Sequence, residues 1–291
     1  MKAVFKHELH SHFTNLTGYV FCAFLLLFTG IYTLINNLGF GYSVTNFEYV
    51  LRSISFVFLF IVPVLTMRVL AEERKQKTDQ LLYSLPLSMS KVVLGKFLAL
   101  LMLFLVPVLI MSVYPLILSA YGNVYLPMSY GALLYFVFLG AALISIGVYV
   151  SSVTENQAVA AGLCFVVMLV NFYISDLTAY LPNTASASFA GFVVLAAVVA
   201  LISWRMTKNS TVGLLVFGLS GIGLAVVYFM DSARFEGLFP ALIGELSLFE
   251  RFDVYMTGGI FDLTSLVYFA SIVVVFLFLS IQSMEKRRWS E

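Results

Sequence analysis

The clearest candidates for chemistry are two adjacent carboxylates, Glu72 and Glu73, which are followed by the basic residue Arg74. Paired glutamates beside a basic residue can activate water in intramembrane proteases, provided that histidines inside the bilayer complete the site. The three histidines of this chain, at positions 7, 10 and 12, all precede the first long apolar run. Their spacing also differs from the H-E-x-x-H pattern of a zinc enzyme. We therefore expect no catalytic residue and no metal site.

A nucleotide-binding loop is also not expected. Gly95-Lys96 resembles the end of a phosphate-binding loop, but Phe97 follows it where Ser or Thr would stand. Ser90 stands where the first glycine of that loop would be. We predict that the chain binds no cofactor, and that any ATP and Mg²⁺ that drive it are bound by a partner chain.

The composition indicates a membrane protein. Of 291 residues, 61% are apolar and 11% are charged, and the mean hydropathy is +1.00. Soluble domains carry about 25% charged residues, so this chain cannot cover a water-facing surface. An ordinary soluble enzyme, a disordered protein and a nucleic-acid binder are therefore excluded. Cys22 and Cys164 lie in apolar runs and are expected to be buried small side chains rather than a disulfide.

Eight apolar runs are long enough to cross a bilayer, which takes about 20 helical residues. The predicted spans are residues 16–38, 53–70, 97–120, 129–153, 158–175, 185–204, 210–230 and 263–284. The sequence therefore predicts an all-α integral membrane protein, with one transmembrane domain over residues 1–291. Glycine and other small residues mark expected helix contacts, among them Gly140, Gly147, Gly162, Gly218 and Gly221.

The positions of Lys and Arg predict the orientation. With eight spans and a cytoplasmic N-terminus, only Arg52, Arg234 and Arg251 of the 16 basic residues fall outside, which leaves 13 inside. We therefore expect both termini in the cytoplasm and a multi-pass location in the cytoplasmic membrane. No carboxylate falls near the middle of a predicted span. That absence argues against a proton-coupled transporter or ion pump.

Two cytoplasmic segments have amphipathic patterns. In residues 1–15, Phe5 and Leu9 recur at helical spacing and Glu8 lies among the polar residues, as in a helix at the membrane surface. In residues 71–90, acidic and then basic residues precede a leucine-rich edge, and Pro86 should end the helix. Ser88 or Ser90 could cap the next helix. A short charged helix of this kind could receive a push from a soluble partner, although a solvated loop has the same composition.

An external segment, residues 231–262, separates the last two spans. Leu246, Phe249 and Phe252 recur at spacings of three, which predicts one apolar helical face, and Gly258-Gly259 should break the helix. The segment could be a cap that closes the outer exit of a pathway. A plain amphipathic surface helix would give the same pattern.

Three segments in this order resemble the membrane subunits of ABC type-2 transporters, and among them the gliding-motility-type permeases. They are F-K-H-E-L-H-S-H-F-T-N-L-T-G-Y-V at 5–20, L-A-E-E-R-K-Q-K-T-D-Q-L-L-Y-S-L-P-L-S at 70–88 and L-S-L-F-E-R-F-D-V-Y-M-T-G-G-I-F-D-L at 246–263. Type-2 subunits commonly have six spans, whereas eight are predicted here. The surplus hairpin is expected near residues 185–230.

The resemblance implies roles for specific residues. The coupling helix, which docks a cytoplasmic ATP-binding subunit, would include Glu72, Glu73, Arg74, Lys77, Thr78, Gln80 and Leu81. The N-terminal segment would be the elbow helix of the family, with Phe5, Glu8 and Leu9. The external segment would form short helices that dip into the outer leaflet, with Phe249, Phe252 and Gly258 at an external gate.

The function expected from residues and resemblance together is that of a permease subunit, which exports an amphiphilic or lipid-like substrate while a separate ATPase hydrolyses ATP. The expected partners are the ABC ATPase subunit, a second identical or related permease subunit, membrane lipid and an accessory extracytoplasmic protein, but no nucleic acid. The main alternative is a membrane scaffold that performs no transport and recruits cytoplasmic proteins through residues 71–96.

Overall fold

The computed structural model describes residues 1–14, 16–38, 46–77 and 88–288. The protein is 86% helical, and no strand occurs in those ranges. The chain divides into two compact units. Unit 1 comprises residues 1–170 and 251–291, and unit 2 comprises residues 171–250. The expected all-α membrane fold is thereby confirmed, and the two units are described separately below.

Within the described ranges, eight helices are long and apolar enough to cross a membrane, as predicted. They are Leu16–Asn37, Phe47–Lys75, Met89–Ser119, Leu126–Val153, Gln157–Thr178, Ala185–Arg205, Ser210–Met230 and Leu263–Arg288. The second and third begin 6 to 8 residues earlier than the predicted starts at 53 and 97. Both extensions contain charged residues, Glu48 and Lys96, that hydropathy alone places outside a span. The structure buries both, with 2% of each exposed.

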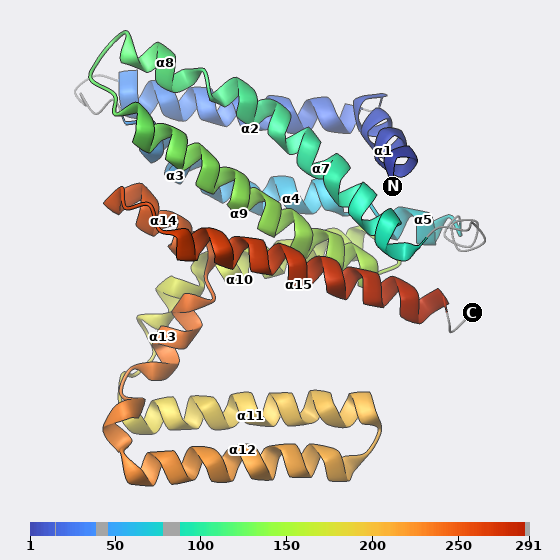
Figure 1. The fold of residues 1–291 in the computed structure, drawn as a ribbon, viewed down its shortest axis with the longest axis vertical. Coiled ribbons are helices and arrows are strands. Elements are labelled where there is room, and N and C mark those ends of the chain that lie inside the picture. The colour runs from blue at the N-terminus through green and yellow to red at the C-terminus, as the bar shows by residue number, and fades with distance from the viewer. Residues whose placement is uncertain (15, 39–45, 78–87, 289–291) are drawn as a thin grey trace. The chain divides into compact units, whose positions relative to one another are not determined.

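Unit 1 is a bundle of helices that run side by side (Figure 1). Its described elements are α1 (Lys2–Thr14), α2 (Leu16–Thr33) with the π-helical η1 (Leu34–Leu38), α3 (Phe47–Ile54), η2 (Ser55–Val57), α4 (Phe58–Thr66), α5 (Ala71–Lys75), α7 (Met89–Met111), α8 (Tyr114–Ser119), α9 (Leu126–Val153), the first part of α10 (Gln157–Thr178), most of α14 (Leu248–Gly258) and α15 (Leu263–Arg288). Short helices replace one straight rod in the second and third spans. In the third, α7 ends at Met111, because Pro115 has no N–H to donate to the Met111 carbonyl and its ring would clash with that carbonyl in a continuous helix.

The core of unit 1 is aromatic and centres on α9. The rings of Phe58, Phe104 and Phe136 lie 4.8 to 5.9 Å apart, and all three are almost fully buried. Gly140 permits this packing, since a Cβ there would lie 2.4 Å from the Phe104 ring. Gly140 is thus a helix contact, as expected. Gly162, by contrast, has nothing within 4 Å of a built Cβ among the described residues.

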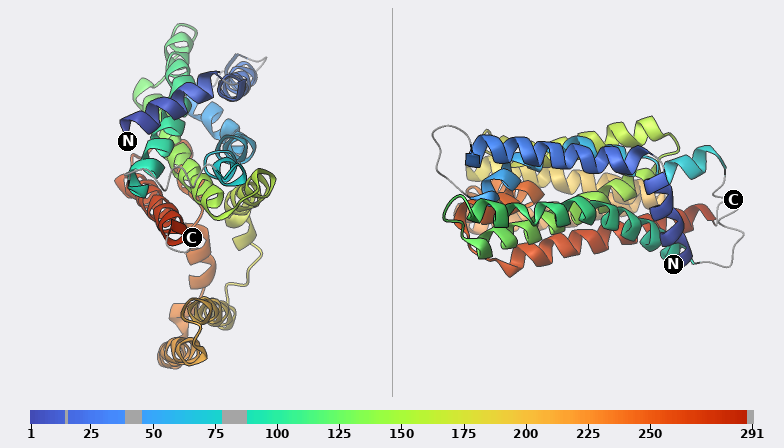
Figure 2. Two further views of the ribbon diagram at one scale, coloured as in Figure 1. Left: turned by 90° about the vertical axis from the view of Figure 1, so that its right-hand side faces the viewer. Right: turned by 90° about the horizontal axis from the view of Figure 1, so that it is seen from above.

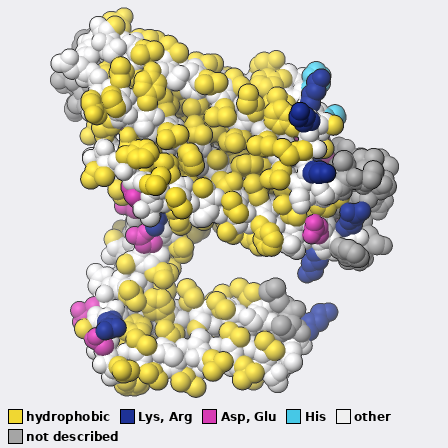
Figure 3. Space-filling model, in the orientation of Figure 1, with side chains coloured by type: hydrophobic (Ala, Val, Ile, Leu, Met, Phe, Trp, Pro, Cys, Tyr) yellow, Lys and Arg dark blue, Asp and Glu magenta, His cyan; other side chains and the backbone are white. Residues whose placement is uncertain are grey.

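Helix α1 lies across one end of the bundle, nearly perpendicular to the spans, as Figure 2 shows. The C-terminal end of α15 lies at this same end (Figure 1). Hydrophobic side chains cover most of the face of unit 1 that is seen in Figure 3, whereas Lys, Arg and His side chains gather at the end that carries α1, α5 and the last turns of α15. Both chain ends therefore lie on one side of unit 1, as an even number of spans requires.

Unit 2 contains the hairpin of α11 (Ala185–Thr207) and α12 (Ser210–Met230), followed by η3 (Ser232–Phe235) and α13 (Leu238–Glu245). The hairpin turns at Lys208, whose φ of 51° is left-handed, and the Asn209 side chain caps α12 by accepting from the Thr211 amide. A helical hairpin is therefore present at residues 185–230, where the sequence predicted one. Leu246 was predicted to share a helix with Phe249 and Phe252. That prediction is wrong, because α14 begins at Leu248 and Leu246 is 48% exposed.

Candidate functional site

A buried lysine joins the two amphipathic segments that the sequence predicted at residues 1–15 and 71–90. Lys96 Nζ on α7 lies 2.6 Å from Glu8 Oε1 on α1 and 2.7 Å from Glu73 Oε1 on α5. The Lys96 side chain is only 2% exposed, whereas the two carboxylates are 17% and 23% exposed. A charge buried to this extent is stable only when it is paired and hydrogen-bonded. We call these three residues the Lys96 clamp.

Close packing of α1 on α7 positions the clamp. Gly95 precedes Lys96, and a Cβ built on it would lie 3.2 Å from the Val4 side chain and 3.3 Å from the Met1 carbonyl oxygen. Helix α1 can therefore approach the start of α7 closely enough for Glu8 to reach Lys96. Phe5 and Leu9 of the predicted elbow helix are half-buried on the same helix. The structure thus brings Glu8 of the elbow segment together with Glu73 of the predicted coupling segment.

Helix α5 is also attached to α9. The amides of Leu70 and Ala71 both donate to Ser151 Oγ, each over 3.1 Å. These amides belong to the first turn of α5, where no intrahelical carbonyl is available to them. A side chain of α9 therefore holds the start of α5.

Arg74 fixes the other side of α5. Its Nη1 donates to the Thr154 carbonyl oxygen at the end of α9 over 3.2 Å, and its Nη2 lies 3.4 Å from Met284 Sδ on α15. The residue is 7% exposed. Helix α5 is thus anchored to α1 and α7 through Glu73, to α9 through Ser151 and Arg74, and to α15 through Arg74.

The remaining predicted coupling residues are half-buried or exposed, or lie outside the described residues. Glu72 is half-buried and accepts a hydrogen bond from Gln76 Nε2 over 3.2 Å. Lys77 is exposed and lies two residues beyond the end of α5, with a left-handed φ of 56°. Thr78, Gln80 and Leu81 lie outside the described residues, as does Pro86. Ser88 stands at the N-cap of α7 but makes no side-chain cap hydrogen bond.

A polar cavity of about 410 Å³ lies next to the clamp. It is lined by His7, Glu8, Ser11, His12, Thr17, Leu65, Arg68, Val69, Glu72, Glu73, Gln76 and Lys96. Burial lowers the pKa of His12 below its ordinary value, an effect that Glu8 opposes and Lys96 reinforces. Among the described residues no group of three or more His, Cys, Asp or Glu side chains could hold a metal ion.

At the opposite end of unit 1, helix α14 packs against the bundle. Phe252 is 1% exposed and its ring lies 6.1 Å from that of Phe136. Arg52 Nη2 on α3 donates to Asp253 Oδ2 over 2.6 Å. Helix α14 ends at Gly258, and the Gly259 amide, with a left-handed φ of 62°, donates to the Tyr255 carbonyl. Two of the predicted gate residues, Phe252 and Gly258, thus belong to this fastened helix.

Phe249, the third predicted gate residue, lies in unit 2. Its ring packs 4.9 Å from that of Phe172, and it is 6% exposed. The nearby Asn171 side chain accepts from the Leu248 amide and donates to the Leu246 carbonyl, which ties the start of α14 to the end of α10. Phe249 therefore makes core contacts within unit 2.

Sequence reasoning missed the partners that hold α5. Lys96 was considered only as a fragment of a phosphate loop, and Ser151 was assigned no contact with this segment. The available signal was the position of Lys96 at the edge of an apolar run, since a lysine there needs a carboxylate or a route to the interface. Sequence reasoning also missed the burial of Glu48, which is 2% exposed. Its Oε2 accepts a hydrogen bond from Ser129 Oγ over 3.4 Å.

The fold and the anchored helix α5 define a polytopic α-helical membrane protein with a short charged helix between its second and third spans. The sequence model of the family described as ABC-2 family transporter protein matches residues 3–206, from α1 to the last turn of α11. The chain belongs to this family, whose members are the membrane components of ABC transporters. No curated protein sequence matches the chain.

Proposed function

We propose that the chain is the permease subunit of an ABC transporter, and that a separate cytoplasmic ATPase drives it through α5. One observation carries this proposal: α5 is exposed at its C-terminal end but anchored on its inner side by Glu73, Arg74 and Ser151. An element with an exposed end and several attachments on its inner side can transmit displacement from a partner to other helices. Some of these helices lie about two hundred residues away along the chain.

The contacts divide the predicted coupling residues into two groups. Glu73 and Arg74 are anchors that hold α5 on the bundle. Lys75, Gln76 and Lys77 are exposed and form the surface that we assign to the ATPase. Motion of α5 would move α1 and α7 together through the Lys96 clamp, and α9 and α15 through Arg74. Buried charged networks have discrete arrangements rather than continuous ones, which suits switching between two states.

Further parts of the proposal rest on the sequence. The excess of basic residues supports a cytoplasmic location for α1, α5 and the end of α15, and with it a transporter in the cytoplasmic membrane. The assignment to gliding-motility-type permeases rests on the three sequence segments alone. A second permease subunit, membrane lipid, an accessory extracytoplasmic protein and an amphiphilic substrate complete the proposal. The segment with Phe249, Phe252 and Gly258 would close the outer exit.

Reversing the exposed charges tests this function. In the complex of the full chain with its ATPase, Lys75→Glu together with Lys77→Glu should abolish substrate-stimulated ATP hydrolysis while the protein remains folded. The matched control is Lys286→Glu, which alters an exposed lysine on α15 at the same end of unit 1. Full stimulation in the double variant would refute the docking role of α5. A membrane scaffold without transport activity predicts that no ATPase co-purifies with the wild type.

A further inference from the structure

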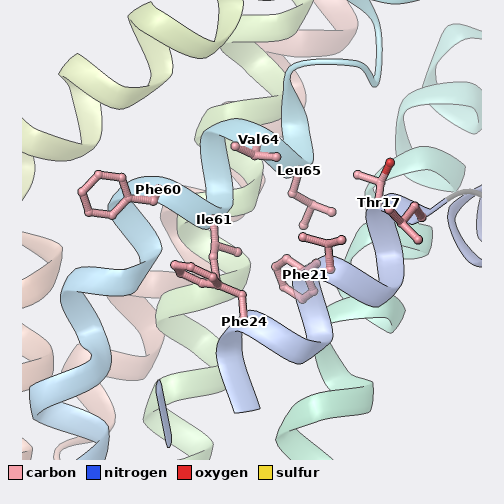
Figure 4. Close-up of a pocket in the computed structure, with 9 residues that line it drawn as sticks. Thr17, Phe21, Phe24, Phe60, Ile61, Val64 and Leu65 are labelled. Carbon is pink, nitrogen blue, oxygen red and sulfur yellow. The ribbon is translucent and has the colours of Figure 1, made fainter. Parts of the chain in front are cut away.

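An apolar groove opens on the side of unit 1 between α2 and α4. Its volume is about 410 Å³, within the range of about 300–1,000 Å³ that is typical of ligand pockets. In Figure 4, Phe21 and Phe24 of α2 and Ile61 and Leu65 of α4 extend into the space between the two helices. The base of the groove is buried, with Leu65 only 2% exposed, whereas Val64 at its edge is 49% exposed.

This groove adjoins the polar cavity beside the Lys96 clamp. Thr17 and Leu65 line both spaces, so the apolar groove and the polar cavity meet at these two residues. Together they form one cleft with a hydrocarbon-like part between two spans and a polar part at the charged end of unit 1. Such a cleft matches an amphiphile whose chain lies in the bilayer and whose head lies at the interface.

The charges of the polar part indicate which head group would fit. Lys96 is already paired with two carboxylates, so the clamp carries a net charge of about −1. Arg68 is exposed and makes no ion pair with any described residue. Glu72 lies one turn further along and is bound by the neutral Gln76. The Arg68 guanidinium and the net negative charge of Glu72 and the clamp are therefore available to a ligand.

We propose that this cleft binds a zwitterionic phospholipid-like amphiphile. One hydrocarbon chain occupies the groove between α2 and α4, the phosphate binds Arg68, and the ammonium group binds the carboxylate of Glu72 near the clamp. A purely anionic head group would bind less well, because the polar part is negative overall. The binding site itself stands on geometry; its role as the loading site for transport rests on the proposed function.

Photolabelling of the full chain in nanodiscs tests the proposal. Three probes with a diazirine in the acyl chain are compared: phosphatidylethanolamine, phosphatidylglycerol and diacylglycerol. The proposal expects the phosphatidylethanolamine probe to label α2 and α4 at residues 20–24 and 60–65 in preference to the other two. Arg68→Gln should lower that labelling about tenfold, because it removes a charge-assisted hydrogen bond to the phosphate group. Val64→Trp should fill the groove and lower the labelling by a similar factor.

Matched variants separate these effects from general perturbation. Leu109→Trp enlarges a lipid-facing residue of α7 that is 65% exposed and outside the groove, and Lys91→Gln removes an exposed cation on the same helix. Both should retain wild-type labelling. Equal labelling by diacylglycerol would overturn head-group recognition, and stronger labelling by phosphatidylglycerol would overturn the charge assignment. Disulfide formation between two copies through Val64→Cys, without lipid labelling, would show that a second copy covers the groove.

The labelling measurement needs no ATPase, so its outcome is distinguishable from that of the proposed function. Lost labelling in Arg68→Gln with intact ATP hydrolysis supports the cleft and leaves α5 as the coupling element. Wild-type labelling in both Arg68→Gln and Val64→Trp overturns the cleft, whatever the hydrolysis assay gives.

Discussion

Replacing Lys96 by methionine should destabilise the protein strongly, because it removes the charge that holds two carboxylates together. Methionine fills a similar volume, so the change is mainly electrostatic. Glu8 Oε1 and Glu73 Oε1 both lie within 2.7 Å of the same nitrogen, so the two oxygens are close neighbours. Without the lysine, two like charges would share a partly buried site.

The magnitude follows from this geometry. Two unit charges about 5 Å apart repel by about 3 kcal/mol at an effective dielectric constant of about 20. Removing one partner of a buried ion pair typically costs about 3–5 kcal/mol, which agrees with this figure. A loss of about 3 kcal/mol corresponds to a fall of roughly 6 to 12 °C in the unfolding temperature of a chain of this size.

Thermal unfolding can be followed with a thiol-reactive fluorophore. Cys164 is fully buried and would report unfolding in a Cys22→Ala background, with Lys91→Met as the exposed-lysine control. Adding Glu8→Gln and Glu73→Gln to Lys96→Met should recover most of the loss, because neutral replacement of a buried ion pair is often tolerated. An unfolding temperature within 1 °C of wild type for Lys96→Met alone would refute the electrostatic reasoning.

Three further predictions concern packing, pH and the external end. Gly140→Ala should destabilise unit 1 by about 1–3 kcal/mol, because its Cβ would meet a buried ring. Gly162→Ala should be neutral or slightly stabilising, and thermal unfolding of the two variants distinguishes them. Because burial keeps the folded-state pKa of His12 below its ordinary value, stability should fall as pH drops through about 6.5, and His12→Asn should remove this slope in unfolding measured against pH. Arg52→Gln should cost less than about 1 kcal/mol, since the pair with Asp253 is exposed, yet should raise hydrogen exchange in α14.

Much of the fold was predictable because membrane helices leave a strong local signal. A run of about 20 apolar residues is enough to identify a span, and the count of eight is confirmed. The helix starts were less predictable, because Glu48 and Lys96 interrupt hydropathy but are buried in the structure. Their burial depends on Ser129, Glu8 and Glu73, which are distant in sequence.

The site was predictable only in outline. The acidic and basic pattern at residues 72–77 indicated a charged helix between spans, and the pattern around Glu8 indicated a surface helix. Neither pattern could show that Lys96 joins the two helices. Lys96 is 88 residues from Glu8 along the chain and 23 residues from Glu73, so no local pattern includes these contacts. Nor could local charge distinguish Glu73 and Arg74, which face the bundle, from Lys77, which faces outward.

The most direct test of the central claim is site-specific photocrosslinking from α5 in the assembled complex. A photoreactive amino acid at Lys77 should crosslink to the ATPase subunit, and the yield should change when ATP is trapped. The same group at Lys208, in the turn of the α11–α12 hairpin, is the control for a basic residue that we do not assign to docking. Crosslinking at Lys77 alone is the predicted result. No ATPase adduct from Lys77, or accessibility of Lys77 only from outside the cell, would contradict the account.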